Sequence, residues 1–163
     1  MTTFVGRYDR QLDPKGRLAL PASIRQKFES QAFLTIGENG CLEAYTPEDH
    51  DQMAQDLRDK ERRREVDRNF VRTKSAKTFE VPIDAQGRVL IDSKLREFAG
   101  LGLGSRVAVI GVYDRVEIWN AERFDDIDAR SSAEWAEVGP TAGRAEVGPT
   151  AGRAGTSSSG EPG

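Results

Sequence analysis

The hydrophobic and polar positions of the chain follow one pattern that occurs twice. An apolar residue precedes Asp-x-x-Gly-Arg and a short apolar run follows it, first over residues 12–20 and again over residues 83–91. The offset between equivalent positions is constant, and the match continues from Ile24-Arg25 onto Leu95-Arg96. Similarity of this length indicates a duplicated structural unit.

Each copy predicts a turn between two short strands. In the first copy, Pro14 presets φ for the second position of a turn, and Gly16 suits the later position that requires a positive φ. The apolar residues on either side predict strands. Pro21 then ends the second strand and begins a helix, in which Ile24 and Phe28 lie on one face.

A hairpin and a helix complete each copy. Residues 33–36 and 41–45 predict strands joined by Gly-Glu-Asn-Gly, and residues 106–110 and 116–119 predict the second hairpin. Thr46, followed by a proline, predicts a capped helix after the first hairpin. We therefore expect an α+β, strand-rich fold of two repeats, each in the order strand, turn, strand, short helix, hairpin, helix.

These repeats define the expected domain organisation. The first repeat and its linking helices occupy residues 1–75, and the second repeat occupies residues 76–124. Because units of about 50 residues bury too little surface to be stable alone, we expect the two repeats to share one core.

The composition changes over residues 125–163. Ala136–Arg144 is repeated without change as Ala145–Arg153, and a Ser- and Gly-rich segment follows. Gly and Pro disfavour regular structure, and the few apolar groups cannot offset the entropy of the chain. We therefore expect a disordered C-terminal tail.

Charge is informative only when it is divided along the chain. The formal net charge is −3, but residues 125–163 contain seven acidic and three basic side chains, so the rest of the chain is nearly balanced. Residues 7–27 contain six basic and two acidic side chains, and residues 58–77 contain nine and four. Local basic surface therefore says more than net charge. For residues 58–77, a solvated helical face is the favoured interpretation.

The sequence offers little for catalysis or metal binding. The chain has one histidine, His50, and one cysteine, Cys41, which cannot form a His-Cys metal cage within one subunit. We expect no catalytic residue, no metal ligand, no cofactor and no small-molecule substrate. The single cysteine favours a reducing cytoplasm, and no stretch approaches the roughly 20 apolar residues of a membrane span, so we expect no membrane partner.

The duplicated turn is the candidate binding site. Glycine lets the backbone approach a ligand closely, and the adjacent arginine presents a planar fork of donors that suits phosphate oxygens or a guanine edge. The alternative is that Asp13 pairs with Arg17, and Asp84 with Arg88, only to brace a tight turn. The residues alone leave both roles open, and both can hold together.

The turns and their surroundings closely resemble the MraZ family. The resemblance rests on Asp13–Pro21, on Asp84–Ile91, and on the ending Val109–Gly111 with Glu117–Trp119, and it covers residues 1 to about 124. MraZ proteins are bacterial regulators with two repeats of the type found in AbrB and SpoVT. The resemblance implies an AbrB-like, pseudo-symmetric barrel that assembles into a homo-oligomeric ring. It further implies sequence-specific binding of double-stranded DNA, at direct repeats upstream of the division and cell wall gene cluster, and association with the nucleoid.

The resemblance also assigns residues. It implies DNA contacts by Lys15, Arg17 and Arg88, and it leaves the shaping of the turns to Asp13, Gly16, Asp84 and Gly87. Proximity and charge add three less secure DNA-binding candidates, Arg7, Arg10 and Arg25. Gln86 stands in the second copy where the first has Lys15, so we expect the second turn to contribute less.

Two other classes of function remain open at this stage. One is an antitoxin-type DNA binder of the AbrB superfamily, although such proteins usually have one repeat per chain and a partner-binding tail. The other is a protein-assembly module that does not bind DNA, in which both arginine turns are internal braces.

Overall fold

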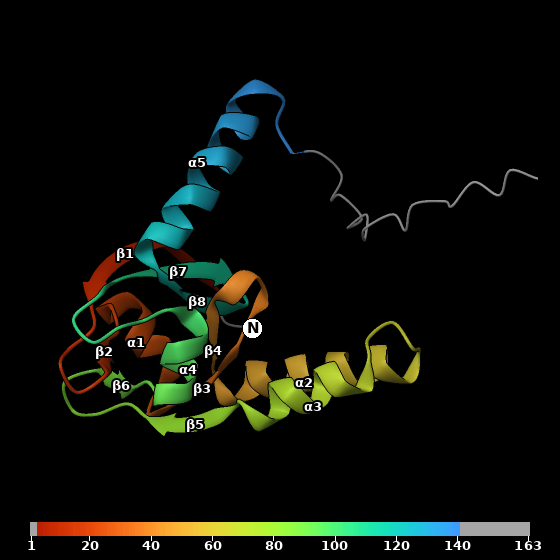
Figure 1. Cartoon of the computed structure of the whole chain (residues 1–163). Helices are drawn as coiled ribbons and strands as arrows, with labels where there is room; N and C mark the ends of the chain where they lie inside the picture. The colour runs from red at the N-terminus through yellow and green to blue at the C-terminus, as the bar shows by residue number, and fades with distance from the viewer. Residues whose placement is uncertain (1–2, 141–163) are drawn as a thin grey trace, which may run out of the picture. The chain divides into compact units, whose positions relative to one another are not determined.

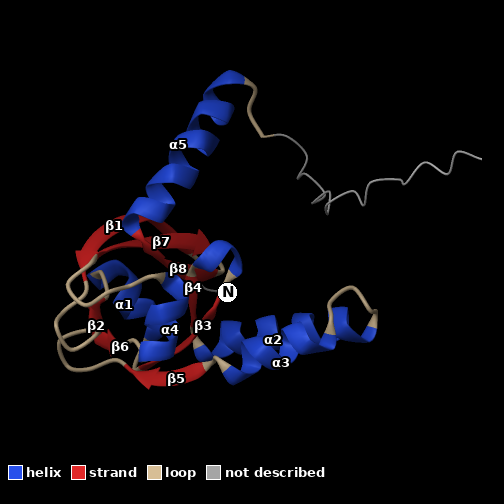
Figure 2. Cartoon of the chain, viewed as in Figure 1, coloured by secondary structure: helices blue, strands red, loops and turns tan. Residues whose placement is uncertain are grey.

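A computed structural model describes residues 3–140 of the chain, which form an α+β fold rich in strands (Figure 1). The strands are β1 (Phe4–Gln11), β2 (Arg17–Ala19), β3 (Gln31–Ile36), β4 (Leu42–Tyr45), β5 (Phe79–Pro82), β6 (Arg88–Leu90), β7 (Arg106–Tyr113) and β8 (Arg115–Asn120). The helices are α1 (Ala22–Phe28), α2 (Pro47–Arg62), α3 (Arg68–Ala76), α4 (Ser93–Ala99) and α5 (Ala121–Glu137), with one 3-10 turn at Glu38–Gly40. The predicted order of elements is confirmed, except that two helices follow the first hairpin (Figure 2).

The two repeats exchange strands. The larger sheet is antiparallel, with the order β1-β7-β8-β4-β3-β5, and β2 pairs with β6 in a separate two-stranded sheet. The first strand of each repeat therefore pairs with the hairpin of the other repeat, β1 with β7 and β5 with β3. The counterparts in the two repeats are β1 and β5, β3 and β7, and β4 and β8. Replacing each strand by its counterpart gives the same strand order read from the other edge of the sheet. Neither repeat completes its sheet alone.

The predicted barrel is not confirmed. Among the described strands, the larger sheet is open, because β1 and β5 are its edges and each pairs along one side only. The strands that follow the two turns, β2 and β6, pair with each other and leave the larger sheet.

One hydrophobic core includes both repeats. Ile24 and Phe28 of α1 are buried together with Leu95 and Ala99 of α4, as the predicted helical face requires. The same cluster contains the buried residues of β2 and β6 and of the central strands of the larger sheet. Cys41 is buried as well, and burial raises the pKa of its thiol to about 12.

The segment after the first hairpin forms a helical hairpin, α2 and α3. Thr46 caps α2 as predicted, because its Oγ1 accepts a hydrogen bond from the backbone N–H of Asp49 at 3.1 Å. Asp67 caps α3 in the same way, accepting from the N–H of Asn69 at 2.7 Å. Most of the predicted basic run therefore lies on two capped helices and their connection.

The prediction of a disordered tail from residue 125 onward is wrong for residues 125–137. These residues continue α5, whose first turn is capped by Asn120 through a hydrogen bond from the N–H of Arg123. Phe124 and Ile127 pack against the buried cluster around Trp119, which supplies the apolar contacts that composition alone did not reveal. The expected disorder of residues 141–163 lies outside the described residues.

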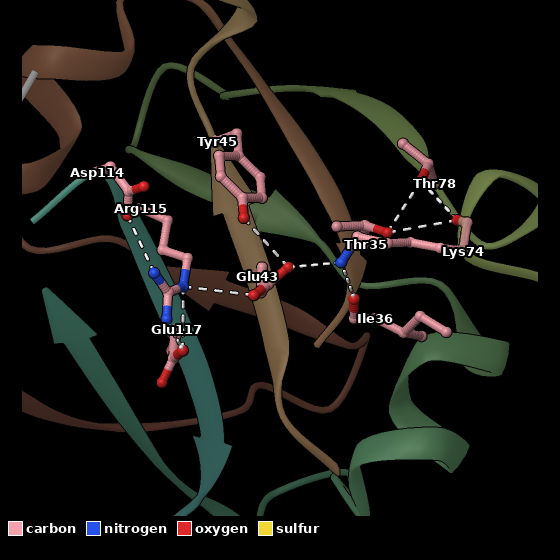
Figure 3. Close-up of polar contacts among 9 residues, drawn as sticks. All are labelled: Thr35, Ile36, Glu43, Tyr45, Lys74, Thr78, Asp114, Arg115 and Glu117. Atoms are coloured by element: carbon pink, nitrogen blue, oxygen red, sulfur yellow. Dashed lines mark hydrogen bonds and ion pairs between the residues drawn. The ribbon is translucent and has the colours of Figure 1, made fainter. Parts of the chain in front are cut away.

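A buried charge network lies on β4 and β8 at the centre of the larger sheet (Figure 3). Glu43 and Glu117 are direct cross-strand partners, and Glu43 is only 8% exposed. Two like charges in this position are unfavourable. Arg115 offsets both negative charges, because its Nε lies 3.3 Å from Glu43 Oε2 and its Nη2 donates to Glu117 at 2.9 Å. Lys74 of α3 also donates to Glu43, at 2.6 Å.

Further donors complete the network. Tyr45 donates its hydroxyl to Glu43 at 3.2 Å, and Trp119 donates Nε1 to Glu117 at 3.1 Å. Burial opposes the charge of Arg115, but the carboxylates of Glu117 and Glu43 outweigh it and raise the pKa of that guanidinium. Lys74 also donates to the carbonyl of Ile36, so its ammonium fastens α3 to the sheet.

Removing Lys74 tests how much this attachment contributes to stability. Lys74→Met leaves the Glu43 carboxylate buried with one cation fewer, so we expect the free energy of unfolding in urea to fall by about 3 kcal/mol. Arg68→Met is the matched control, because Arg68 lies on α3 like Lys74 and pairs with Glu61 of α2, but its side chain is 73% exposed. The control should change stability by less than about 1 kcal/mol. Equal, small effects of the two substitutions would contradict the stabilising role of Lys74 in attaching α3 to the sheet.

Candidate nucleic-acid interface

The β2–β6 ribbon presents the predicted arginines on one face. Its register pairs Arg17 with Leu90 and Ala19 with Arg88. Between them, Leu18 and Val89 are fully buried in the core. Because strand side chains alternate between two faces, all four outer residues lie on the face opposite the core. The two arginines are diagonal neighbours on that face, a relation that typically separates Cα atoms by about 7–8 Å.

The aspartate of the first copy holds its turn together. Asp13 Oδ1 accepts the backbone N–H groups of Lys15 and Arg17, both at 2.8 Å, and Oδ2 accepts Arg17 Nε at 2.9 Å. The backbone closes the same loop, with the N–H of Gly16 donating to the carbonyl of Asp13 at 3.0 Å. One carboxylate therefore fixes both the turn and the arginine that follows it.

The second copy repeats this geometry. Asp84 Oδ1 accepts the N–H groups of Gln86 and Arg88, and Oδ2 accepts Arg88 Nε, all at 2.9 Å. The predicted brace is therefore present in both turns. Each aspartate contacts its arginine through Nε, so the pair orients the guanidinium and does not use the hydrogens on its two terminal nitrogens.

The same contacts keep both aspartates charged. The backbone N–H of Arg17 is the largest cause that lowers the pKa of Asp13, burial opposes it, and the Arg17 side chain and the N–H of Lys15 lower it further. The pKa of Asp84 is lowered in the same way, first by the N–H of Arg88. Both carboxylates therefore stay ionised near neutral pH.

The two turns are joined across the repeats. The N–H of Leu20 donates to the carbonyl of Gly87, and the N–H of Ile91 donates to the carbonyl of Gly16, both at 2.9 Å. In addition, Arg88 Nη1 lies 3.9 Å from Asp13 Oδ2, which is close enough for an ion pair but too long for a hydrogen bond. The positions of the two turns are thus fixed relative to each other.

Two helical arginines reinforce the junction reciprocally. Arg25 of α1 donates to the carbonyl of Ala85 at 3.0 Å and packs over Gly87 in the second turn. Arg96 of α4 donates to the carbonyl of Ile91 at 3.1 Å and lies against Gly16 in the first turn. Our sequence interpretation gave Arg96 no role, although its alignment with Arg25 in the duplicated pattern was the available signal.

The predicted DNA-binding residues fall into two groups. Lys15 is exposed at the tip of the first turn, and Arg17 and Arg88 are about 30% exposed, at 31% and 27%. Arg25 lies beside the second turn. Arg7 and Arg10 belong instead to β1, at the edge of the larger sheet.

The two β1 arginines have local partners. Arg7 Nη2 forms an ion pair with Asp125 at 2.7 Å, and its guanidinium carbon lies 5.4 Å from the centre of the Phe124 ring. Arg10 donates to the carbonyl of Asp9 at 2.9 Å. The structure therefore gives Arg7 a role in attaching the start of α5 to β1.

The fold and this site define a class of protein: two strand-exchanging α+β repeats whose Asp-x-x-x-Arg turns meet on one ribbon. A comparison with known families agrees with this class. The family model described as "MraZ protein, putative antitoxin-like" matches residues 3–73 and again residues 75–140. The chain belongs to the MraZ family. This family consists of regulators rather than enzymes, and membership indicates a regulator of transcription.

Other kinds of site were sought in the part of the chain that the structure describes. Within residues 3–140, no helix is long and apolar enough to cross a membrane. No group of three or more His, Cys, Asp or Glu side chains among these residues could hold a metal ion.

Gly87→Ala tests the contact between Arg25 and the second turn. Gly87 has φ +77°, and an added Cβ would lie 2.7 Å from Arg25 Cδ. Gly104 has the same φ with open space around it, so Gly104→Ala measures backbone strain alone, about 1–2 kcal/mol. We expect Gly87→Ala to lower the free energy of unfolding by about 1 kcal/mol more, because Arg25 must leave Ala85. In the double variant with Gly87→Ala and Arg25→Ala, the extra loss of stability relative to Gly104→Ala should disappear. If it persists, the proposed contact between Arg25 and the second turn is wrong.

Stability below neutral pH should depend on the turn carboxylates. A carboxylate whose pKa is lowered by folding stabilises the protein above its unfolded pKa of about 4, and that stability is lost as the pH falls through the folded value. We therefore expect Asp13→Asn to lower the melting temperature at pH 7, with the difference from the unsubstituted chain shrinking below about pH 4. Asp51→Asn controls for the loss of one surface charge. A difference that stays constant down to pH 3 would contradict this role of Asp13.

Proposed function

We propose that the chain is a sequence-specific DNA-binding transcriptional regulator that acts through the outer face of the β2–β6 ribbon. The observation that carries this proposal is the placement of Arg17 and Arg88 on one outward face, each oriented by its own aspartate. The major groove of DNA admits a two-stranded β-ribbon, and an arginine fork suits the O6 and N7 atoms of guanine or phosphate oxygens. An orienting carboxylate reduces the cost of ordering the arginine on binding.

The brace and the ligand contact are compatible in this geometry. The aspartates use Nε, so the terminal nitrogens can donate to DNA while the brace stays intact. Lys15 adds a point charge beside the first arginine, and Arg25 places a further cation beside the second turn. These residues are the proposed DNA contacts.

We further propose that the protein acts as a homo-oligomeric ring on direct repeats upstream of the division and cell wall gene cluster. One protomer offers only a few cationic contacts, which give modest and salt-dependent affinity. A ring presents the same face several times, and engagement of successive DNA repeats multiplies weak affinities through effective concentration. Action on DNA places the protein in the cytoplasm, at the nucleoid. Co-purification of a toxin would favour the antitoxin alternative instead.

Arg17→Ala tests the proposed function. We expect it to reduce affinity for operator DNA at least about fivefold in a gel-shift assay, because a two-pronged arginine contact to a base contributes about 1–3 kcal/mol. Arg17→Lys keeps the charge without the planar fork and should recover only part of the affinity. Arg63→Ala is the charge-matched control, since its side chain lies in the α2–α3 connection and is 63% exposed.

Two further readouts separate DNA binding from a purely structural brace. Size-exclusion chromatography should show an unchanged oligomer for Arg17→Ala. For the unsubstituted chain, the logarithm of DNA affinity should fall linearly with the logarithm of salt concentration. Full binding by Arg17→Ala, or the absence of a salt dependence, would support the protein-assembly alternative.

A further inference from the structure

An exposed leucine shares the outer face of the ribbon with the two arginines. Leu90 is 56% exposed, although the residues on either side of it, Val89 and Ile91, are buried. A single exposed leucine is common on protein surfaces and needs no explanation by itself. Leu90 differs because it is the direct cross-strand partner of Arg17, on the face that carries the proposed DNA contacts.

The two ends of the ribbon are chemically different. The first end combines Arg17 with Leu90 from the opposite strand, and the exposed Lys15 lies in the turn that leads into it. The second end combines Arg88 with Ala19 across the ribbon, and Gln86 occupies the place of the lysine. Ala19 and Leu90 are equivalent positions of the two copies. The first end is therefore the more apolar of the two, and its turn itself carries one basic side chain more.

We propose that Leu90 determines specificity by contacting the C5-methyl group of a thymine in the major groove, beside the base pair that Arg17 contacts. This inference rests on the proposed function. Directly opposed side chains on a ribbon have Cβ atoms about 4.5–5.5 Å apart, and successive base pairs are about 3.4 Å apart, so two neighbouring side chains reach the same or adjacent base pairs. The thymine methyl is the apolar group of the major groove, and apolar side chains recognise it by contact.

The inference has a consequence for the shape of the DNA site. Because Ala19 is too short to reach as far as Leu90, the two ends of one ribbon read different sequences. A protomer with unlike ends reads a half-site that is not itself a palindrome, so the half-site has a direction. A half-site with a direction is what a direct repeat requires.

Replacing thymine by deoxyuridine removes the methyl group and leaves the base-pairing edge unchanged, so it tests the contact directly. The probe is a duplex recovered from a random-sequence pool by binding to the full chain, with each thymine replaced singly. We expect one replacement to weaken binding by the unsubstituted chain about fourfold, the effect of one buried methyl-sized group. Leu90→Ala should lose a similar factor on the thymine duplex and show no further loss with deoxyuridine at that position.

Two variants make the test specific. Leu90→Met keeps a long apolar side chain and should retain the sensitivity to deoxyuridine. Val5→Ala is the matched control, because Val5 is 57% exposed on β1 of the larger sheet, and it should behave as the unsubstituted chain. Thermal unfolding should show that Leu90→Ala is folded, as expected for an exposed position.

The outcomes separate the inference from the proposed function. If Leu90→Ala binds the thymine duplex normally, or stays equally sensitive to deoxyuridine, the role of Leu90 is wrong while dependence on Arg17 still supports DNA binding. If Leu90→Ala weakens binding but no single deoxyuridine weakens binding by the unsubstituted chain, recognition of a thymine methyl group is wrong, and the inference fails in this case too. If no duplex is recovered from the pool, the proposed function fails and the inference fails with it.

Discussion

Neither repeat of this protein completes its own structure, and the candidate site depends on that constraint. β1 pairs with the hairpin of the second repeat, and β5 pairs with the hairpin of the first. The same exchange occurs at the turns, where the backbone of each turn accepts a hydrogen bond from the strand end of the other repeat. The helices repeat it once more, because Arg25 of α1 donates to the second turn and Arg96 of α4 lies against Gly16 in the first turn. Two turns far apart in the sequence are thereby held beside each other on one ribbon.

This arrangement removes the apparent choice between a brace and a ligand contact. A free arginine loses considerable side-chain entropy when it binds. In each turn the aspartate has already ordered the guanidinium through Nε, and hydrogen bonds keep that aspartate ionised. Under the proposed function, the brace is therefore a means of presenting the arginine to DNA. In the larger sheet, Lys74 and Arg115 offset the opposed carboxylates of Glu43 and Glu117 in a similar way, and Lys74 also attaches α3 to the sheet.

Much of this fold follows from local sequence signals, and the rest depends on contacts that such signals do not contain. The order of elements, the Thr46 cap and the turn geometry around Gly16 and Gly87 follow from turn chemistry and periodicity. The pairing of β2 with β6 does not, because a three-residue strand has no pattern that selects its partner. The length of α5 was missed because Phe124 and Ile127 are stabilised by packing near Trp119, which composition cannot predict. The turn residues of the candidate site follow from the sequence, whereas the role of Arg96 required its contact with the first turn and that of Leu90 required the register of the ribbon.

The central claim is that the paired turns present a basic face to repeated DNA, so the most direct test measures recognition of repeats. The DNA immediately upstream of the gene that encodes this chain provides the probe. Gel-shift titration should be done on that fragment with its repeats intact, and on a fragment of the same length and composition with the repeats scrambled. We expect retardation of the intact fragment and a loss of affinity of at least tenfold on scrambling. Equal binding to both fragments, or to neither, would contradict it.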